Sequence, residues 1–433
     1  MKQETILYES PEYKRSRNAY LMQCAFEYFV AIIVGGSFLT KLLGYVGFSD
    51  AAIGIISSLI SLTCVFQLLS MLVVQKICNT KKYSMTLQAL GRLLFMSLYL
   101  IPFLPFAKEY RGILIVAGIV LAYLCYYLAT SVTFKWGNSF VDPTKRASFS
   151  AVKEMVSLIL GMIVTLAVGY VMDAFEAADN LEGGFIFCAV AILIFATCDL
   201  TCLLLIKNDI KPKTKQETVP MKVVLQNTIG KKGFRNIVIL STLYNIAVYF
   251  SVGFLSTYRL NPHELAFSVA TVELFNVIGN GARFLISKPF GRYSDRTTFA
   301  KGAELGMGLA AISFVLSVFT VPATRYLVIL QILLYHMAAA GVGQNMLNIT
   351  YNYVDMKYFV QASAIKNALG GLCGFGASLL GSALLTAIQN NGNQIFGLPV
   401  YGQQLMSLIT AALLTVCILF NRKVVQKEKI KIQ

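Results

Sequence analysis

The chain has 433 residues, of which 56% are hydrophobic and 13% are charged, and its formal net charge is +16 at pH 7. Soluble domains carry about 25% charged residues, so this composition and a mean hydropathy of +0.65 exclude an ordinary water-soluble protein. The positive charge does not indicate nucleic-acid binding, because no basic run is interleaved with aromatic residues on a soluble module.

Long apolar runs recur along the whole chain, separated by short polar breaks. Runs of about 20 residues are long enough to cross a bilayer, and they must be helices because lipid cannot hydrogen-bond the backbone. We predict twelve spans, near residues 19–44, 50–75, 84–104, 112–134, 149–172, 184–206, 236–259, 264–288, 299–320, 325–348, 362–387 and 401–421. The expected fold class is therefore an all-α integral membrane protein with twelve transmembrane helices.

A polar, basic segment at the centre of the chain, residues 207–235, divides the spans into two sets of six. Its proline and glycine residues argue against one continuous helix. The expected organisation has five parts: an N-terminal tail at 1–18, a six-helix bundle at 19–206, the linker at 207–235, a second six-helix bundle at 236–421 and a C-terminal tail at 422–433.

The distribution of basic residues predicts the orientation. About 30 of the Lys and Arg residues fall in the tails, the linker and the other breaks that follow even-numbered spans. The breaks on the opposite side hold Lys108, Arg111, Arg259 and Arg325. Positive residues favour the cytoplasmic side, so we expect both termini and the linker to be cytoplasmic and the protein to lie in the plasma (inner) membrane.

The two halves look like copies of each other. Residues 140–153 align with 353–366, with identical Asp142/Asp355 and Lys153/Lys366, and residues 18–42 align more weakly with 236–260. Chance similarity between apolar helices is an alternative for the second pair. Two repeats of six spans in the same direction form the parallel-repeat architecture of one large transporter class.

On these features the chain resembles the major facilitator superfamily. The segment GRYSDR after span 8 is similar to that family's loop signature, with Gly291, Asp295 and Arg296 in place, and Arg292 within the segment is a further gating candidate. The corresponding segment after span 2, KICNTKK, has Lys76 where the family has glycine. The resemblance implies the fold of that family, transport by alternating access, and a gating role for the residues of GRYSDR.

The expected gate is built on charge. Asp295 can accept hydrogen bonds from a helix N-terminus or pair with a cation, and Gly291 permits a tight turn at a helix end. Asp142, Lys153 and Lys366 are further gating candidates. The alternatives are a solvated basic loop for GRYSDR and, for the two lysines, side chains that reach the interface without pairing.

The first candidate for a substrate- or ion-binding site is Glu27, near the middle of span 1, with Gln23 on the same helical face. Charge inside a span is costly and marks a pathway. The nearest cation along the helix is Lys41, about 21 Å away at 1.5 Å per residue, so a desolvated carboxyl would hold its proton, as a proton carrier must. Its repeat mate is Asn245, with Tyr249 on the same face. A structural pairing of Glu27 with another helix is the alternative.

The second candidate is a polar stripe on span 8, Glu273, Asn276 and Asn280, which share one helical face. Gln331 on span 10 and Tyr127 on span 4 complete the set. Aromatic rings and amides are suited to a sugar or a nucleoside. Hydrogen bonds that join helices are the alternative for the stripe. The resemblance places Arg92 and Asp199 on peripheral spans and implies structural pairing for both.

We therefore expect a monomeric secondary active transporter that moves a small polar solute, sugar-like or nucleoside-like, with protons as the coupling ion and lipids around it. A drug or metabolite exporter of the same superfamily is the main alternative. An integral-membrane transferase acting on lipid-linked groups and a transport-dead sensor are more distant ones. The chain has no GxxxxGK[ST] motif for ATP, and no enzyme activity, metal or cofactor is expected.

Overall fold

The structure is a computed structural model that describes residues 8–74, 77, 79–142, 146–208, 221–355, 358–395 and 397–427. Its contacts divide the chain into two compact units. Unit 1 comprises Met1–Val46 and Phe66–Thr218, and unit 2 comprises Gly47–Val65 and Val219–Gln433. The units follow the two expected bundles except for the segment Gly47–Val65, which packs with the C-terminal residues.

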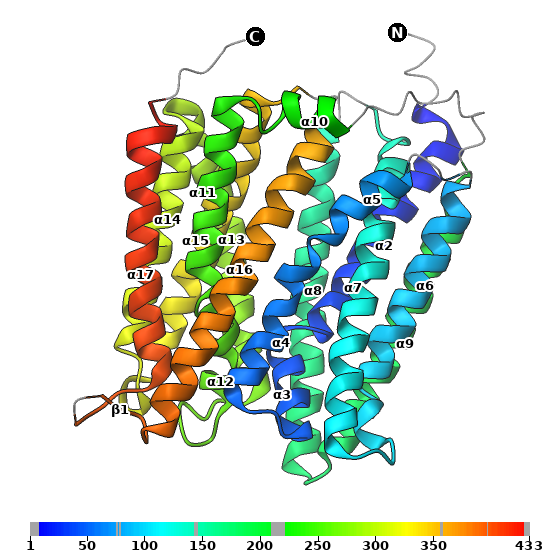
Figure 1. Ribbon diagram of the computed structural model, residues 1–433. Coiled ribbons are helices and arrows are strands. Elements are labelled where there is room, and N and C mark those ends of the chain that lie inside the picture. Colours follow the sequence, from blue (N-terminus) through cyan, green and yellow to red (C-terminus); the bar gives the residue numbers. More distant parts are fainter. Residues whose placement is uncertain are drawn as a thin grey trace. The chain divides into compact units, whose positions relative to one another are not determined.

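Unit 1 is built from seven helices in its described residues (Figure 1): α2 (Pro11–Ile33), α3 (Gly36–Val46), α5 (Phe66–Val74), α6 (Thr80–Leu98), α7 (Lys108–Asn138), α8 (Arg146–Ala177) and α9 (Leu181–Leu205). The short 3-10 helix η1 (Ile101–Phe103) follows α6. Helix α2 lies against α8 and α9, and α6 lies against α7 and α9.

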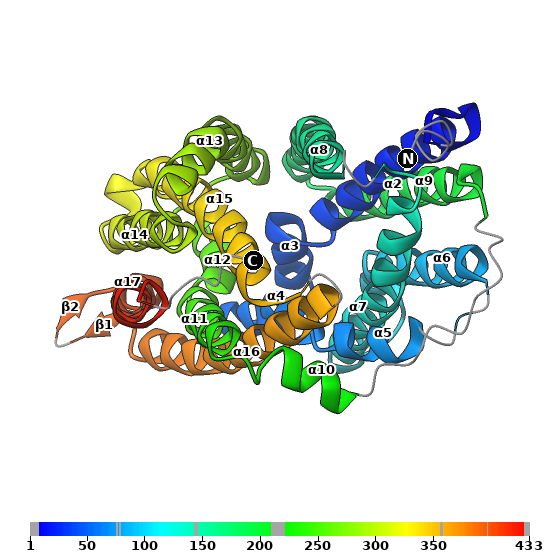
Figure 2. The same ribbon diagram turned by 90° about the horizontal axis from the view of Figure 1, so that it is seen from above.

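Unit 2 contains α4 (Asp50–Thr63), α10 (Met221–Asn227), α11 (Lys232–Tyr249), α12 (Leu255–Leu260), α13 (Val269–Arg296), α14 (Phe299–Val318), α15 (Leu327–Tyr353), α16 (Phe359–Asn390) and α17 (Gly402–Phe420). Short helical turns η3 (Val252–Phe254), η4 (Pro322–Thr324) and η6 (Asn421–Val425) flank these helices, and β1 (Gln394–Ile395) pairs with β2 (Leu398–Pro399). Helix α14 lies beside α15 and α17, and α16 lies beside α11 and α4 (Figure 2).

The predicted all-α membrane fold is confirmed. In the described part of the chain, 11 segments are long and apolar enough to cross a membrane. Helix α6 occupies the position of the third predicted span and is the one that this criterion omits. It carries Lys81, Lys82 and Arg92, so its sequence is less apolar than that of the other spans.

Three predicted spans are interrupted helices. The first breaks between α2 and α3, where Gly36 has a φ of +52° that glycine adopts without strain. The second breaks after Thr63, and the seventh after Tyr249. The helical face of Gln23 and Glu27 therefore ends with α2, and Lys41 on α3 forms an ion pair with Glu176 of α8.

The GRYSDR segment does not form the expected turn at a helix end. Helix α13 continues through Pro289 and Gly291 to Arg296, so Gly291 lies inside the helix. The turn falls after Arg296, where Thr298 accepts a hydrogen bond from the backbone N–H of Lys301 and begins α14. Within the linker, α10 is the described helix, and the expected basic residues Lys211, Lys213 and Lys215 lie outside the described residues.

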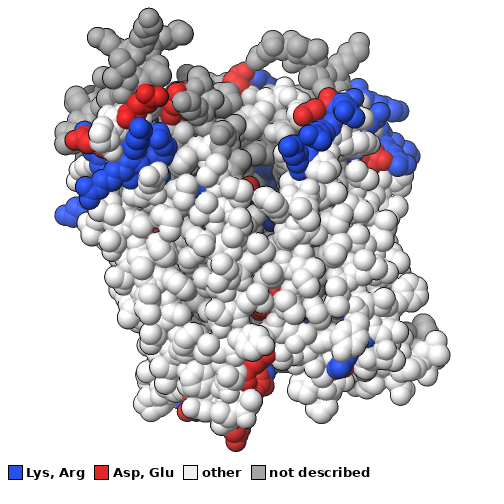
Figure 3. Space-filling view, turned by 180° about the vertical axis from the view of Figure 1, so that it is seen from behind, with Lys and Arg blue, Asp and Glu red and all other residues white. Residues whose placement is uncertain are grey.

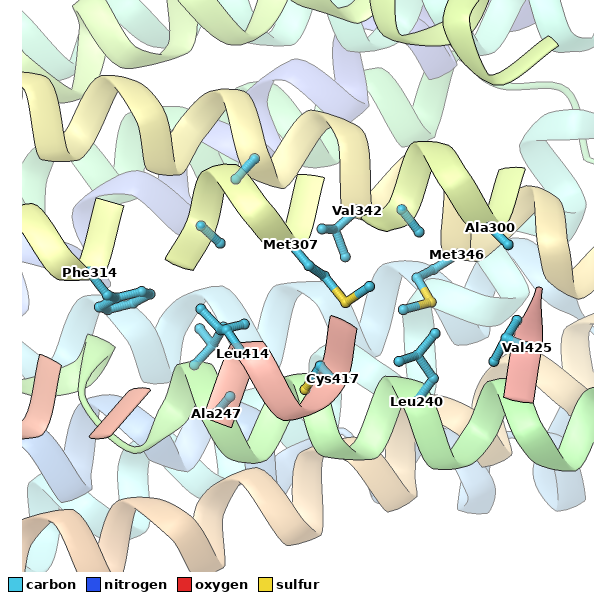
Figure 4. Packing of buried hydrophobic residues seen from close by; sticks show 14 of the residues in the cluster. Leu240, Ala247, Ala300, Met307, Phe314, Val342, Met346, Leu414, Cys417 and Val425 are labelled. Carbon is cyan, nitrogen blue, oxygen red and sulfur yellow. The ribbon is translucent and has the colours of Figure 1, made fainter. Parts of the chain in front are cut away.

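The core of unit 2 is packed between α11, α14, α15 and α17 (Figure 4). Met307, Val342 and Leu414 come together there with exposed fractions of 0%, 3% and 0%. A Cβ added to Gly306 would lie 2.8 Å from the backbone N of Val342, so glycine allows α14 and α15 to approach closely. Small residues take this role because lipid provides no hydrophobic force to join the helices.

Close packing also explains the glycine-rich α16. A Cβ at Gly371 would lie 2.0 Å from the Ser61 carbonyl oxygen of α4, and one at Gly374 would lie 2.7 Å from the Tyr249 ring.

The basic side chains gather toward one end of the helices, and a band with few charges covers their middle (Figure 3). This pattern suits helices that cross a bilayer.

Candidate functional site

Unit 1 encloses a network of buried polar side chains from four helices. Gln23 on α2 has an exposed fraction of 0% and lies at its centre. Its Nε2 donates to Glu27 Oε2 at 2.8 Å and to Asp199 Oδ1 of α9 at 2.9 Å, and it lies 3.4 Å from Gln88 Oε1 of α6. Gln88 in turn donates to Thr133 Oγ1 of α7 at 3.2 Å.

Arg92 supplies the positive charge of this network. Its Nε donates to Asp199 Oδ2 at 3.1 Å, and its Nη2 lies 3.8 Å from Glu27 Oε2. The exposed fractions of the Arg92, Asp199 and Glu27 side chains are 4%, 0% and 17%. Nη2 of Arg92 has no hydrogen-bond partner among the described residues, so the guanidinium retains a donor on the side that faces Glu27.

The charges of this triad do not cancel when both acids are ionised, because two carboxylates then share one guanidinium. Net charge in a membrane interior is costly. One proton taken up by the pair of acids makes the triad neutral and keeps the Arg92–Asp199 ion pair. Glu27 is the more exposed of the two acids, so water reaches it more readily.

The structure corrects the expectation that Glu27 has no close cation. Arg92 of α6 lies 3.8 Å from Glu27, and Lys41 forms an ion pair with Glu176. The structural pairing expected for Arg92 and Asp199 is present, but it includes Glu27, so it belongs to the candidate site. The sequence feature that points to this cluster is the presence of charged residues within spans 3 and 6, because a buried arginine needs an acid as its partner.

Tyrosines of α7 adjoin the network. The Tyr126 hydroxyl interacts with the Glu27 carboxylate. The candidate Tyr127 is buried, with its ring centroid 5.1 Å from that of Tyr126 and 6.2 Å from that of Tyr123. The tyrosine that reaches the acid is therefore Tyr126, one position before the residue expected from the sequence.

In unit 2 the candidates form separate pairs. Glu273 on α13 is 5% exposed and accepts a hydrogen bond from Asn276 Nδ2 at 3.1 Å. Because α13 begins at Val269, Glu273 lies about 6 Å from the start of the helix at 1.5 Å per residue.

Gln331 on α15 belongs to a second pair. Arg259 Nη2 of α12 donates to Gln331 Oε1 at 2.8 Å, and Gln331 Nε2 donates to Ser313 Oγ of α14 at 3.3 Å. The charge of Arg259 also acts on Glu273. Arg259 had been assigned to an outer break, and the structure instead turns it into unit 2, where it joins α12 to the candidate residues of α13 and α15.

The third pair is Asn280 of α13 and His336 of α15, with Asn280 Oδ1 2.9 Å from His336 Nδ1. Asn245 of α11 donates to the Ser241 carbonyl oxygen of its own helix, and both Asn245 and Tyr249 pack against glycines of α16. The structure brings Glu273, Asn276 and Gln331 into one region through Arg259. Tyr249 adjoins this region, because Tyr335 interacts with both Tyr249 and Arg259.

The expected gating residues are dispersed. Arg292, Asp295 and Arg296 are exposed on the last turns of α13, and no ion pair of Asp295 occurs among the described residues. Lys153 lies 5.0 Å from the centre of the Tyr20 ring, which is a cation–π contact.

The remaining two gating candidates, Lys366 and Asp142, have different surroundings. Lys366 of α16 is 7% exposed, so it is buried along its length. Asp142 interacts with other residues of the structure. Its repeat mate Asp355 forms an ion pair with Lys231 at 3.1 Å, which joins the start of α11 to the end of α15.

A further buried acid lies in the loop between α12 and α13. Glu264 is 6% exposed, its Oε1 lies 3.5 Å from Gln403 Nε2 of α17, and its Oε2 has no partner among the described residues. Burial, and secondly the negative charge of Asp50, raises the pKa of the Glu264 carboxyl to about 8. Asp50 itself accepts hydrogen bonds from Gln389 at 3.0 Å and Asn261 at 3.4 Å.

The described residues contain no group of three or more His, Cys, Asp and Glu side chains that could hold a metal ion. The candidate clusters are instead built from amides, arginines and carboxylates. Such groups hold protons and bind hydroxyl groups or ring nitrogens by hydrogen bonds.

A helical membrane protein with buried polar clusters inside its helix units is typical of transporters. The family model of the Major Facilitator Superfamily matches residues 20–382. The chain therefore belongs to this superfamily of membrane transporters. A search of curated proteins gives no match.

Solved structures share the fold. A D323A mutant of the nucleoside transporter NupG has a TM-score of 0.69 and 15% identity, with 94% of this chain and 99% of that chain covered. A D-xylose-proton symporter gives 0.69 and 15%, with 94% and 96% covered. An auto-inhibited peptide transporter of the POT family gives 0.72 and 10%, with 96% and 97% covered.

Proposed function

We propose that this protein is a proton-coupled secondary active transporter of a small polar solute, sugar-like or nucleoside-like, that works by alternating access. The observation that carries the proposal is the triad of Glu27, Arg92 and Asp199 inside unit 1. Two acids around one arginine change from a net charge of −1 to zero with a single proton. A transporter needs such a group to couple a proton gradient to movement.

The substrate class rests on the chemistry of unit 2 and on the neighbours in fold. Asn276, Gln331 and Asn280 present amides, and Tyr335 and His336 present aromatic rings on α15. Amides match the hydroxyl groups of a sugar or nucleoside, and flat rings stack on its ring. Two of the solved structures with the same fold are titled a nucleoside transporter and a D-xylose-proton symporter.

The proposal includes the expected placement of the protein. It is a monomer in the plasma membrane, with its two six-helix halves at residues 19–206 and 236–421 and with both termini and the 207–235 linker cytoplasmic. The concentration of basic residues in the tails and the linker supports this orientation. Labelling of a single cysteine introduced in the linker with a membrane-impermeant reagent tests it, and labelling from outside intact cells contradicts it.

The coupling test is Glu27→Gln in proteoliposomes. The amide keeps the shape of the protonated acid and can still accept the hydrogen bond from Gln23, but it cannot release a proton. We expect gradient-driven accumulation to fall to equilibration of the substrate, while counterflow exchange stays within about twofold of wild type.

The matched control is Glu273→Gln, the same substitution at the buried acid of unit 2. It should change substrate affinity and retain accumulation. Accumulation by Glu27→Gln at the wild-type level under an imposed proton gradient would contradict the proposal. If Glu273→Gln alone lost accumulation, the coupling acid would be Glu273.

A further inference from the structure

A cavity of about 720 Å³ lies in unit 2 between α14 and the end of α17. Its mouth is lined by Lys301 and Arg422 and by Tyr293 from the last turns of α13, and its floor by apolar residues that include Leu305 and Ile312 of α14. Its volume is within the range of about 300–1,000 Å³ that ligand sites occupy. It lies outside the buried clusters described above.

The mouth of this cavity carries a net positive charge. Arg422 forms an ion pair with Glu304, which leaves the charge of Lys301 in excess. Lys301 is exposed in the first turn of α14, where the helix dipole adds further positive potential. An anion is therefore attracted to this point, and the Tyr293 hydroxyl can donate a hydrogen bond to it.

The apolar lining of the cavity, which includes Leu305, Gly308 and Ile312, forms a groove along α14, and Phe319 follows just past the end of this helix. Leu305, Ile312 and Phe319 recur every seven residues on one side, with exposed fractions of 44%, 53% and 63%. A Cβ added at Gly308 would meet no atom within 4 Å, so this glycine leaves open space between the apolar residues. A soluble anion would contact the mouth and leave this groove empty.

We propose that this cavity binds one anionic phospholipid, with its phosphate between Lys301 and Arg422 and an acyl chain along Leu305 and Ile312. The two ends of the cavity match the two ends of such a molecule. A neutral lipid matches only the groove, and a free phosphate matches only the mouth. The site is independent of the transported solute and of proton coupling.

The test is native mass spectrometry of the purified full-length protein, titrated with phosphatidylglycerol or phosphatidylcholine of identical acyl chains. We expect one phosphatidylglycerol to bind several times more tightly than phosphatidylcholine. Lys301→Gln should weaken phosphatidylglycerol roughly fivefold, the effect of one basic residue near an anionic lipid. Gly308→Leu, which fills the groove, should weaken both lipids.

Each variant has a matched control. Lys82 occupies the same position in α6 as Lys301 in α14, because its backbone N–H is bonded by the N-cap residue Asn79. Lys82→Gln removes the same charge from a helix start without the cavity and should leave the tight site unchanged. Gly376 on α16 has the same open surroundings as Gly308, so Gly376→Leu controls for adding a side chain to a helix.

Three results would overturn the proposal. Equal affinity for the two lipids would show that charge does not select the ligand. Displacement of the lipid by inorganic phosphate at equal concentration would show a site for a soluble anion. Equal effects of Lys301→Gln and Lys82→Gln would show that the lipid binds only through the general charge of the protein.

Discussion

Buried acids have different surroundings in the two units. In unit 1, Glu27 and Asp199 share Arg92, with Gln23 hydrogen-bonded to both carboxylates. In unit 2, Glu264 is buried beside Gln403 and near Asp50, and it forms no ion pair in the part of the chain that the structure describes.

The contrast shows two ways to bury a carboxyl. A guanidinium offsets the cost of desolvating a carboxylate, so an acid beside it can stay ionised. Burial favours the neutral acid instead, and burial first and the negative charge of Asp50 second raise the pKa of Glu264 to about 8. The triad of unit 1 can change its net charge by one proton and keep the Arg92–Asp199 ion pair. An ionised Glu264, in contrast, would destabilise the folded state.

The largest effect is expected for Arg92→Gln. The substitution leaves Asp199, with an exposed fraction of 0%, without its cation. Breaking one partner of a buried pair costs about 3–5 kcal/mol, so thermal unfolding of the purified protein should show a strongly lowered melting temperature. Arg259→Gln in unit 2 is the comparison, because Arg259 donates to a neutral amide and its charge acts on Glu273, and it should cost less than the loss of the Arg92–Asp199 pair.

The double variant Arg92→Met, Asp199→Leu sharpens this test. Replacing a buried pair with apolar residues is often neutral for stability, so the double variant should recover most of the lost melting temperature without recovering transport. A double variant as unstable as Arg92→Gln would show that the pair is not the source of the loss.

The second prediction is a pH dependence at Glu264. Between the ordinary glutamate value of about 4.5 and the folded value of about 8, the folded state holds a proton that the unfolded chain releases. The free energy of unfolding should therefore fall by about 1.4 kcal/mol per pH unit, or by about 5 kcal/mol at most, as the pH rises through this window. The groups that face Glu264 are Asp50 and Tyr258, and neither supplies a positive charge.

Glu264→Gln measures the contribution of that proton. The amide keeps its contact with Gln403 and does not titrate, so melting temperatures of the variant should vary less between about pH 5 and pH 8 than those of wild type. An unchanged pH profile would assign the dependence to another group.

The third prediction concerns the separate pairs of unit 2. Gln331→Ala removes the amide that connects Arg259 to Ser313. If this region binds the hydroxyl groups of the solute, the transport KM should rise about tenfold with little change in the maximal rate, since one hydrogen bond to a charged partner is worth about 1.5 kcal/mol. Thr165→Ala, at a buried hydroxyl of unit 1, should leave KM unchanged.

The smallest effect is expected for Asp295→Asn. The exposed position of Asp295 at the end of α13 makes the substitution harmless to the fold. If it pairs with a cation when the inner side closes, the variant should favour the inward-open form and change the transport rate by a few fold. Transport and inner-side cysteine accessibility identical to wild type would exclude a gating role.

The sequence by itself determined the class of fold and the positions of most helices. The length of an apolar run is a local property of the sequence. The runs at 149–172 and 299–320 therefore correspond to α8 and α14, and most of their ends agree within a few residues. The buried position of Glu27 beside Gln23 was also local, because helical spacing places residues four apart on one face. The breaks in the first, second and seventh spans were less visible, since the sequence stays largely apolar across each of them.

Only the tertiary structure decided which charges meet. Arg92 and Asp199 are 107 residues apart, and Glu27 lies on a third helix, so no periodicity could join them. The same holds for Arg259, which local charge counting placed in an outer break and packing turned toward Gln331. Helix packing brings together side chains from distant parts of the chain. In a membrane protein, these contacts determine how much free energy each buried charge costs.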